Sequence, residues 1–333
     1  MSEPVSQSQV FARILDASKA IYPQVSVTPL QPSSRLSAES GCQVLLKYEN
    51  MQPTGSFKIR GATNKVRLLD GSSRRAGVLT ASTGNHGVAV ARAGALAGVP
   101  VKVYVSNATV PAKLAAIRSR GAELVLVDGP PLEAELAARR RAEEDGLVYI
   151  SPYNDLDVIA GQGTLGAELL RQEPELDAVF IAVGAGGLIG GTGSAIKALN
   201  PRVQVVGVWP EASLCMLRAL EAGRIVPVEE HESLSDGTLG AIEPGSLTFP
   251  ICQAVIDAKV VVSETEIAAA MSKLVASEDL MVEGAAGVAL AGLMKSAPAY
   301  RGRKVAVVLC GRNVGPRAFM AAIGGQVENR RAP

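Results

Sequence analysis

Metal-binding and aromatic residues are scarce in this chain of 333 residues. Aromatic residues make up only 4% of the sequence, so the core must be built mainly from Ala, Val, Leu and Ile. There are two histidines and four cysteines, and no two cysteines form a C-x-x-C pair. Because zinc sites use closely spaced Cys and His ligands, the sequence does not predict a zinc site, and we expect no bound metal. The cysteines are Cys42, Cys215, Cys252 and Cys310.

An excess of charge of one sign is missing too, since 33 Lys and Arg residues face 32 Asp and Glu residues and the formal net charge is +1. Proteins that bind nucleic acid usually carry a clear basic excess, so we expect no nucleic-acid partner. The N-terminus has no basic start followed by an apolar stretch, which argues against a signal peptide. The most apolar window, FIAVGAGGLIGG, is short and rich in glycine, so it does not predict a membrane span. We therefore expect no membrane partner and a location in the reducing cytoplasm.

Two sets of apolar strands alternate with alanine-rich helices along the chain. Continuously apolar strands separated by helices indicate parallel sheets covered on both faces. We therefore predict an α/β fold with two lobes, each a twisted, parallel-rich sheet covered by helices, and an active site in the cleft between them. The expected strands are 43–49, 76–82, 101–106, 122–128, 147–151, 177–183, 203–209, 258–263 and 303–310. The expected helices are 85–98, 111–121, 131–146, 159–172, 188–199, 264–279 and 285–297, with another at 11–21 that packs on the surface or on a second subunit.

One lysine, Lys58, stands between Phe57 and Ile59 in PTGSFKIRGA (53–62), at the expected start of a helix. Lysines often lie along apolar surface on their methylene stems and keep the charge in water. A desolvated lysine instead loses its proton more easily and becomes an amine nucleophile that forms Schiff bases. This stretch alone favours the first interpretation, so the choice depends on the rest of the chain.

The strongest local signal is VGAGGLIGG (183–191), which follows a predicted strand and opens a helix. Glycines let the backbone approach a ligand, and the N–H groups at a helix start attract phosphate. The dinucleotide pattern G-x-G-x-x-G matches at Gly184 and Gly186 but fails at Ile189, although Glu211 could serve as a ribose acid. The loop therefore predicts a site for a single phosphate, ahead of tight helix packing alone and ahead of a nicotinamide dinucleotide.

A second polar loop, STGNHG (82–87), also joins a predicted strand to a helix. The hydroxyl groups of Ser82 and Thr83, the backbone of Gly84 and Asn85, and the Asn85 amide place many donors at one helix start. Such a group suits a carboxylate. Ordinary N-capping needs only one such residue, so the run indicates more than a cap.

Three further polar residues follow strands or precede helices, and each has a purely structural interpretation. Cys310, at the end of a predicted strand in LCGRN, is by itself most simply a small buried hydrophobe. Glu283 in VEGAAG is explained by the dipole of the helix that follows it. Asp236 in LSDG is more typical of a turn than of a catalytic acid.

Together these loops combine a lysine, a cradle for one phosphate, a carboxylate-binding turn and a polar residue at a strand end. A cofactor that forms an imine with lysine and carries one phosphate uses all four, and pyridoxal phosphate is that cofactor. The chain in fact resembles the fold-type II pyridoxal-phosphate enzymes, which share the fold of the tryptophan synthase β subunit. Within that group it is similar to the serine/threonine dehydratases and serine racemases, over residues 10 to 325.

The resemblance assigns roles to individual residues. PTGSFKIRGA resembles the Schiff-base segment, with Lys58 as its lysine and Phe57 beside it. STGNHG resembles the loop that grips the substrate carboxylate, with Asn85 also facing the cofactor's ring hydroxyl. LCGRN resembles the segment in which a Ser, Thr or Cys, here Cys310, meets the pyridine nitrogen. The implied phosphate contacts are Gly184, Ala185, Gly186, Gly187 and Leu188, the implied carboxylate contacts are Ser82, Thr83, Gly84, Asn85 and His86, and Glu283 and Asp236 are expected in polar contact near the cofactor or substrate.

The sequence departs from the family pattern at several of these positions. Ala185 replaces a glycine of the phosphate loop, and Arg312 replaces the second glycine of S-G-G-N. Thr83 stands where serine racemases carry a serine base, which weakens the prediction of racemisation. Trp209 and Cys215 stand near the places of two acidic cation ligands of eukaryotic-type racemases, so no cation site is carried over. The chain ends soon after LCGRN, so we expect no C-terminal regulatory domain and no feedback by isoleucine.

The resemblance implies a large cofactor-binding domain made of residues 1–70 and 151–333, with a smaller α/β domain, 71–150, inserted in it. It also implies α,β-elimination from a β-hydroxy amino acid, L-threonine and/or L-serine, to a 2-oxo acid and ammonia, in a homodimer or larger homo-oligomer. The alternatives within the family are a serine racemase, a hydroxyaspartate dehydratase and a dehydratase of hydroxyectoine breakdown. Outside it, the alternatives are an NAD-dependent dehydrogenase and a non-catalytic ligand-binding relative.

Overall fold

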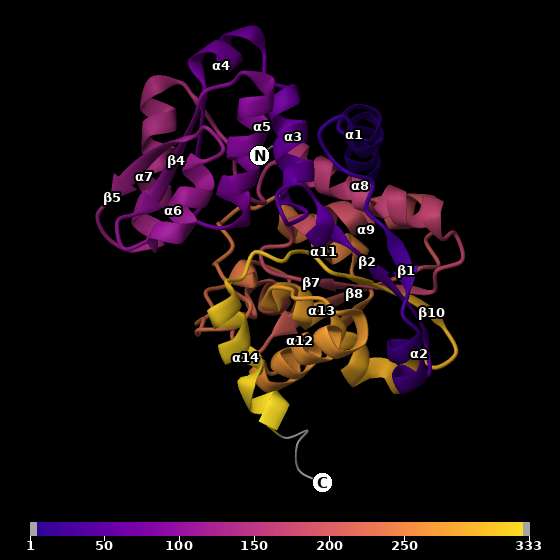
Figure 1. Cartoon of the computed structure of the whole chain (residues 1–333). Helices are drawn as coiled ribbons and strands as arrows, with labels where there is room; N and C mark the ends of the chain where they lie inside the picture. The colour runs from indigo at the N-terminus through magenta and orange to yellow at the C-terminus, as the bar shows by residue number, and fades with distance from the viewer. Residues whose placement is uncertain (1–4, 329–333) are drawn as a thin grey trace.

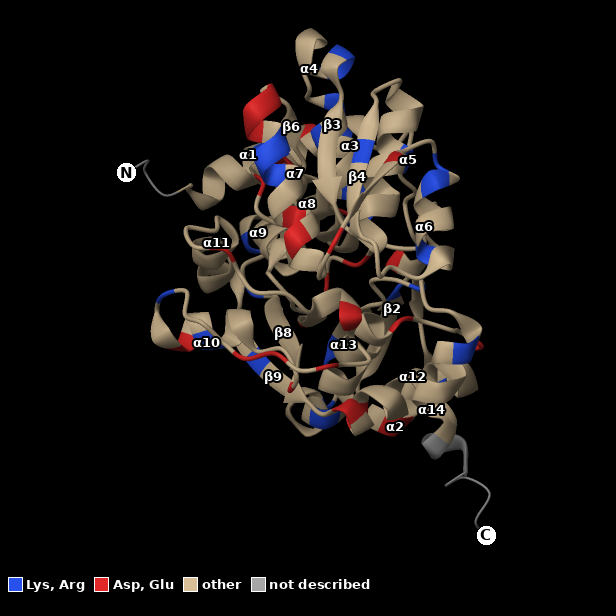
Figure 2. Cartoon of the chain, turned by 90° about the vertical axis from the view of Figure 1, so that its left-hand side faces the viewer, with Lys and Arg blue, Asp and Glu red and all other residues tan. Residues whose placement is uncertain are grey.

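The structure is a computed structural model and describes residues 5–328 of the chain. It contains two sheets, one of six strands and one of four, and each sheet is covered by helices. The smaller sheet and its helices form the upper part of Figure 1, and the larger sheet lies below them. In the view of Figure 2 the positions of basic and acidic residues are mixed along the ribbon of both lobes.

The larger sheet has the strand order β1-β2-β10-β7-β8-β9. Each neighbouring pair is parallel except the edge pair of β1 and β2. Its central strands β7 and β8 are apolar and almost entirely buried, which is the pattern of a parallel sheet covered on both faces. The strands are β1 (Leu30–Pro32), β2 (Gln43–Lys47), β7 (Ala178–Ala182), β8 (Gln204–Pro210), β9 (Ala258–Val262) and β10 (Lys304–Val308).

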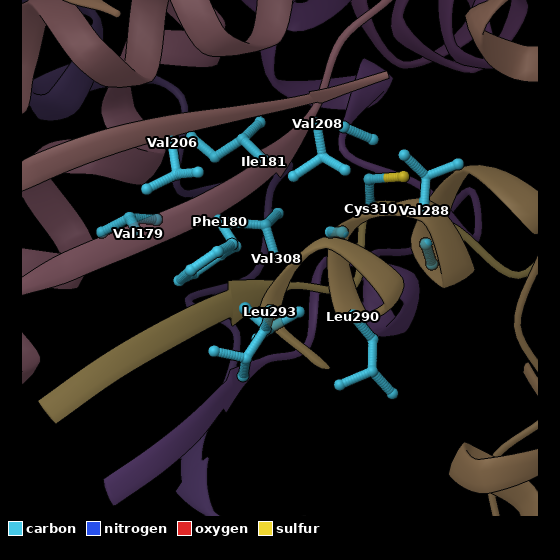
Figure 3. Packing of buried hydrophobic residues seen from close by; sticks show 14 of the residues in the cluster. Val179, Phe180, Ile181, Val206, Val208, Val288, Leu290, Leu293, Val308 and Cys310 are labelled. Atoms are coloured by element: carbon cyan, nitrogen blue, oxygen red, sulfur yellow. The ribbon is translucent and has the colours of Figure 1, made fainter. Parts of the chain in front are cut away.

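Helices pack on both faces of this sheet. Helix α13 lies against β7, β8, β9 and β10 and carries α12 on its outer side, whereas α9 contacts the sheet from the other face and packs on α8. Figure 3 shows the apolar packing between α13 and the central strands, with Cys310 at the edge of the packed group. The helices of this lobe are α1 (Gln7–Ala20), α2 (Ser34–Ser40), α8 (Leu156–Gln172), α9 (Gly187–Leu199), α10 (Cys215–Ala222), α11 (Thr248–Val255), α12 (Glu264–Glu278), α13 (Gly284–Ser296) and α14 (Pro316–Glu328), with short 3₁₀ turns η1 (Glu49–Met51), η2 (Asp236–Thr238) and η3 (Ala297–Tyr300).

The smaller sheet is entirely parallel and has the strand order β5-β4-β3-β6. Helix α5 packs on this sheet and also on α3, which is followed by the short α4. The strands are β3 (Val78–Ala81), β4 (Val101–Ser106), β5 (Glu123–Val127) and β6 (Val148–Tyr149), and the helices are α3 (Lys58–Arg67), α4 (Gly71–Ala76), α5 (Asn85–Ala97), α6 (Pro111–Arg118) and α7 (Pro131–Asp145).

The two parallel sheets and the helices between their strands confirm the predicted α/β class. The core of the small lobe also includes Ile59, Ala62 and Val66 of α3, which the predicted boundary at residue 70 assigns to the large lobe. The division into 1–70 plus 151–333 and 71–150 therefore stays a prediction.

Several elements were not expected from the sequence, namely the short β1, α2, α4, α10 and α11 and the longer helix α14. The helix expected at 11–21 is α1, and it packs on α8 and α9 through Val10 and Ile14. Trp209, on β8, is completely buried, and its ring lies over Gly207, where an added methyl group would come within 2.4 Å of the indole. Within residues 5–328 no helix is both long enough and apolar enough to cross a membrane.

Candidate active site

Lys58 is the first residue of α3 and points toward the segment that precedes α8. Its Nζ donates to the backbone oxygen of Pro152 at 3.0 Å and lies 5.3 Å from the centre of the Phe57 ring. Burial lowers the pKa of the Lys58 amine to about 8, although Cys310 and Glu283 act in the opposite direction. An ammonium group held in water at the end of an apolar stem would show no such shift, so the surroundings favour the chemical interpretation of this lysine.

A fully buried network of charges holds α3 in place, two residues beyond Lys58. The Arg60 guanidinium donates to both carboxylate oxygens of Glu49, at 2.7 and 2.8 Å, and to Glu168 at 3.0 Å. Lys47 of β2 forms an ion pair with Glu168 of α8, and Tyr22 donates to the same carboxylate. Burial alone would raise the pKa of Glu168, but the charges of Arg60 and Lys47 outweigh it and lower that pKa. The network joins β2, α3 and α8, so it fixes the position from which Lys58 projects.

The predicted phosphate loop connects β7 to α9. Gly186 is the N-cap of α9 and has a φ of 90°, a conformation that glycine adopts without strain. Within the described residues, none of the backbone N–H groups from Gly184 to Ile189 donates to another protein group. These free donors lie at the positive end of the helix dipole, and this is the chemistry that binds one phosphate group. The loop thus fits the phosphate of the expected cofactor.

Gly186→Ala should lower both the affinity for the cofactor and the stability of the protein. A methyl group there would lie 2.6 Å from Cys252 Sγ and 2.9 Å from the Met216 methyl carbon, in addition to the strain of a positive φ. We expect a loss of stability of about 1–3 kcal/mol. The matched control is Gly223→Ala, where φ is 67° but an added methyl group meets nothing within 4 Å. Thermal unfolding of both apoproteins tests this, and equal losses would contradict the steric argument.

The predicted carboxylate loop lies at the N-terminus of α5, in the small lobe. Ser82, Thr83 and Asn85 are partly exposed, and Ser82 Oγ accepts from the Gly84 N–H at 3.2 Å. His86 is buried and donates from Nε2 to the backbone oxygen of Ile150 at 3.0 Å. Burial and the nearby charge of Lys58 lower the pKa of His86 to about 3, so its ring is neutral. The His86 side chain is therefore occupied inside the lobe, and only its backbone N–H remains for the predicted carboxylate contact.

Cys310 follows β10, and its backbone oxygen accepts from the Phe57 N–H at 3.1 Å. The side chain is buried, and burial together with the charge of Glu283 raises the pKa of its thiol well above the ordinary value. The thiol is consequently neutral at physiological pH. The strand end therefore lies against the Lys58 segment, and Cys310 also fills a place in the core, while its contact with the pyridine nitrogen stays a prediction.

Glu283 is the N-cap residue of α13, but its side chain does not cap that helix. Instead its two oxygens accept from Asn85 Nδ2, at 2.9 and 3.0 Å, and one also accepts from the Asn313 N–H at 3.2 Å. The helix-dipole explanation for Glu283 is therefore incomplete. Asn313 was missed as a site residue, although it ends the LCGRN motif and donates from Nδ2 to Asn85 Oδ1 and to the backbone oxygen of Thr54.

Asp236 lies apart from this group on the exposed turn η2. It forms an ion pair of 3.4 Å with Lys113 of α6, so it bridges the two lobes at the surface. A second bridge joins Arg139 of α7 to Glu243 at 3.2 Å. Arg312 is exposed, and its N–H donates to the Gly55 backbone oxygen. In the described part of the chain no three His, Cys, Asp or Glu residues are grouped to hold a metal ion, and the expected absence of a metal stays a prediction.

The structure thus brings Lys58, Asn85, Glu283 and Cys310 together where the two lobes meet. It places the glycine loop at the end of β7 in the same large-lobe sheet, beside β10. A cavity of about 730 Å³ is lined mainly by the segment after α10 and the segment that leads into α11, and its wall includes Cys215, Ile225 and Phe249 but not Lys58. We therefore assign the candidate active site to the place where these loops meet and not to this cavity.

Comparison with known proteins agrees with this geometry. Residues 21–311 match the family model described as "Pyridoxal-phosphate dependent enzyme". The chain is 40% identical over 301 residues to an L-threonine ammonia-lyase of Thermotoga maritima, covering 90% of this chain and 75% of that protein. It is 34% identical to an L-threo-3-hydroxyaspartate ammonia-lyase of a Pseudomonas species, covering 94% and 98%. Among solved structures, processed threonine deaminase isoform 2 of Solanum lycopersicum superimposes with a TM-score of 0.92 at 31% identity, covering 97% and 95%.

Proposed function

Since the chain belongs to the family of pyridoxal-phosphate dependent enzymes, we propose that it is an ammonia-lyase for a β-hydroxy amino acid, L-threonine and/or L-serine. The products are a 2-oxo acid and ammonia. The observation that carries the proposal is Lys58, a buried lysine whose pKa is lowered to about 8, at the meeting point of the two lobes with Asn85 and Cys310 around it. The family match and the likeness to an L-threonine ammonia-lyase support the same reaction.

The cofactor, when bound, supplies an electron sink for charge that develops at the substrate α-carbon. Lys58 would hold it covalently, and the free N–H groups of the 184–188 loop would hold its phosphate. With cofactor and substrate bound, the freed Lys58 amine would take the α-proton as a general base. A pKa near 8 suits this role, because roughly one molecule in ten then carries a neutral amine at pH 7.

The remaining residues orient the substrate. Ser82, Thr83 and the N–H groups at the start of α5 offer donors for its carboxylate, with the helix dipole adding attraction. The Cys310 thiol stays neutral, so it places no negative charge beside the ring nitrogen of the cofactor. Departure of the β-hydroxyl group, which takes up one proton and leaves as water, then competes well with reprotonation of the α-carbon. The enamine product hydrolyses to the 2-oxo acid and ammonia.

A substrate with a second carboxylate is less suited to this site. Glu283 in the site is acidic, Asp236 on the surface turn acts on it electrostatically, and Lys113 is already paired with Asp236. Like charges placed close together are unfavourable, so L-threo-3-hydroxyaspartate should react more slowly than L-threonine. Serine racemisation stays the weaker alternative because a threonine, Thr83, stands at the position of the racemase serine. The homo-oligomer is part of the proposal and is supported by the resemblance alone.

Purified enzyme loaded with the cofactor should release a 2-oxo acid from L-threonine or L-serine. L-threonine, L-serine and L-threo-3-hydroxyaspartate are each incubated with the enzyme in separate reactions, and the 2-oxo acid is trapped as its hydrazone. The serine that remains is resolved into its enantiomers. The matched control is the Lys58→Arg variant under the same conditions. Release from hydroxyaspartate alone would overturn the substrate assignment and keep the family, whereas D-serine without 2-oxo acid would point to the racemase.

A further inference from the structure

Glu283 is a buried carboxylate without a cationic partner in hydrogen-bond contact. Its residue is 5% exposed, and the described structure gives it no salt bridge. Burying a charge in this way is costly unless its hydrogen bonds are satisfied. The donors that satisfy it come from different lobes, since Asn85 begins α5 of the small lobe and Asn313 follows β10 of the large lobe.

The Glu283 carboxylate occupies a space that the glycine at position 311 leaves open. An added methyl group at Gly311 would lie 2.2 Å from Glu283 Oε1, so only glycine leaves room there. Asn313 is held in turn against the lysine segment, because its Nδ2 donates to Thr54 at 2.8 Å and a methyl group at Gly55 would meet its Oδ1 at 2.4 Å. The carboxylate, the Asn313 amide and the Lys58 segment are therefore packed as one unit.

We propose that ionised Glu283 is a positioning residue that fixes the orientation of the Asn85 amide and joins the two lobes across the active site. The inference rests on the proposed function only in that Asn85 is taken as a contact of the cofactor. A carboxylate can only accept, so it selects the orientation in which Asn85 turns Nδ2 toward it and Oδ1 toward Asn313. The second hydrogen on Nδ2 is then available as a donor to the site.

Protonation of Glu283 would remove this selection. A carboxylic acid carries its own O–H donor, which faces the Asn85 N–H₂ group unfavourably and allows the amide to turn over. Burial raises the pKa of Glu283 from 4.5 to about 7, with Asp236 acting in the same direction and the hydrogen bonds from Asn85 and Asn313 and the charge of Lys58 opposing it. The other titratable group that faces it is the Cys310 thiol, which stays neutral.

The first test uses the apoprotein and needs no activity. The folded pKa lies above the unfolded one, so between about pH 4.5 and about pH 7 the folded parent retains a proton that the unfolded chain has lost. Ionisation of the unfolded chain therefore lowers the stability of the parent increasingly as pH rises through this window. Glu283→Gln has no such group. The difference between its melting temperature and that of the parent should therefore increase in favour of the variant over this pH window and stay constant at higher pH. A difference that does not change with pH would overturn the proposal.

Hydrogen exchange of the apoprotein tests the positioning itself. At about pH 8, where Glu283 is ionised, the hydrogen-bonded amides of α5 from Val88 onward should exchange about tenfold faster in Glu283→Gln than in the parent, since a charge-assisted hydrogen bond at the head of the helix is lost. Asn313→Ala provides a second variant that leaves the carboxylate in place and should speed the same amides by a smaller factor. Asp236→Asn is the matched charge control and should not speed them. Equal protection in parent and Glu283→Gln would overturn the proposal.

The pH profile of the loaded enzyme gives a third readout. For the parent, kcat/KM should rise with pH as Glu283 ionises, with a midpoint above the ordinary range of a carboxyl group. In Glu283→Gln the limb due to Glu283 should disappear and leave only the dependence on the Lys58 amine, whose pKa is about 8, and kcat should fall about tenfold. Asp236→Asn should keep the limb and move it to lower pH, since it removes a like charge. Persistence of the limb in Glu283→Gln would overturn the proposal, whereas failure of the proposed function would leave both apoprotein results unaffected.

Discussion

Lys58→Ala should lose the absorbance that the covalently bound cofactor gives at the edge of the visible range, and kcat should fall by about 10³-fold or more. Alanine removes both the amine that anchors the cofactor and the base that takes the α-proton, and removal of a general base alone commonly costs 10²- to 10⁴-fold. The Lys58 amine is suited to both roles because burial has lowered its pKa to about 8. The spectrum and the initial rate with L-threonine measure the two losses separately.

Two further variants make this result specific. Lys58→Arg keeps a cation at the head of α3 but cannot supply a neutral amine, so it should resemble alanine in both measurements. Lys65→Ala removes the next lysine of the same helix, which pairs with Asp155 and Asp157, and should keep the absorbance. An unchanged spectrum of the Lys58→Ala protein would contradict the hypothesis that Lys58 holds the cofactor covalently.

Arg60→Ala should produce the largest loss of stability, about 3–5 kcal/mol in the free energy of unfolding. The substitution leaves the carboxylates of Glu49 and Glu168 buried without their shared cation. Because Arg60 lies one half-turn beyond Lys58, the remaining folded protein should also bind the cofactor less tightly. The midpoint of thermal or denaturant unfolding measures the first effect, and cofactor titration measures the second.

Arg218→Ala is the matched control for this loss, since Arg218 pairs with Glu221 on an exposed face of α10. Surface pairs of this kind are worth at most about 1 kcal/mol. Arg60→Lys should be intermediate, because an ammonium group keeps the charge but not the paired hydrogen bonds to Glu49. A small effect of Arg60→Ala, similar to that of Arg218→Ala, would show that the network does not stabilise the fold.

The sheets were predictable because their signal lies within single segments. Apolar strands such as Ala178–Ala182 and Gln204–Pro210 are buried on both faces, and a continuous apolar run is the pattern of such strands. Short elements were missed for the opposite reason. β1 has three residues and α10 has eight, too few for a periodic pattern to stand out. The domain division remains untested because α3 contributes to the small-lobe core from outside the predicted boundary.

The motifs of the site were predictable from local chemistry, but their environment was not. The glycine loop and the Lys58 segment can be identified from their local sequences alone. The Arg60 network, by contrast, joins residues 108 positions apart, Arg60 and Glu168, and Lys47 looked like an ordinary charged residue in a strand. Likewise, the turn of Glu283 away from its own helix depends on Asn85, 198 residues earlier. Contacts of this range exist only after the lobes have folded, so no local pattern records them.

The placement of Trp209 makes the two halves of the molecule optically distinct. It is the only tryptophan of the chain and is fully enclosed beside Gly207, while Tyr104 and Tyr149 belong to the sheet of the small lobe. Tryptophan emission during denaturation therefore reports on the large lobe alone, and far-ultraviolet circular dichroism reports on both lobes. If the two signals change at different denaturant concentrations, the halves unfold in separate steps, and the tertiary contacts that hold the active-site loops together are lost before the chain is fully unfolded.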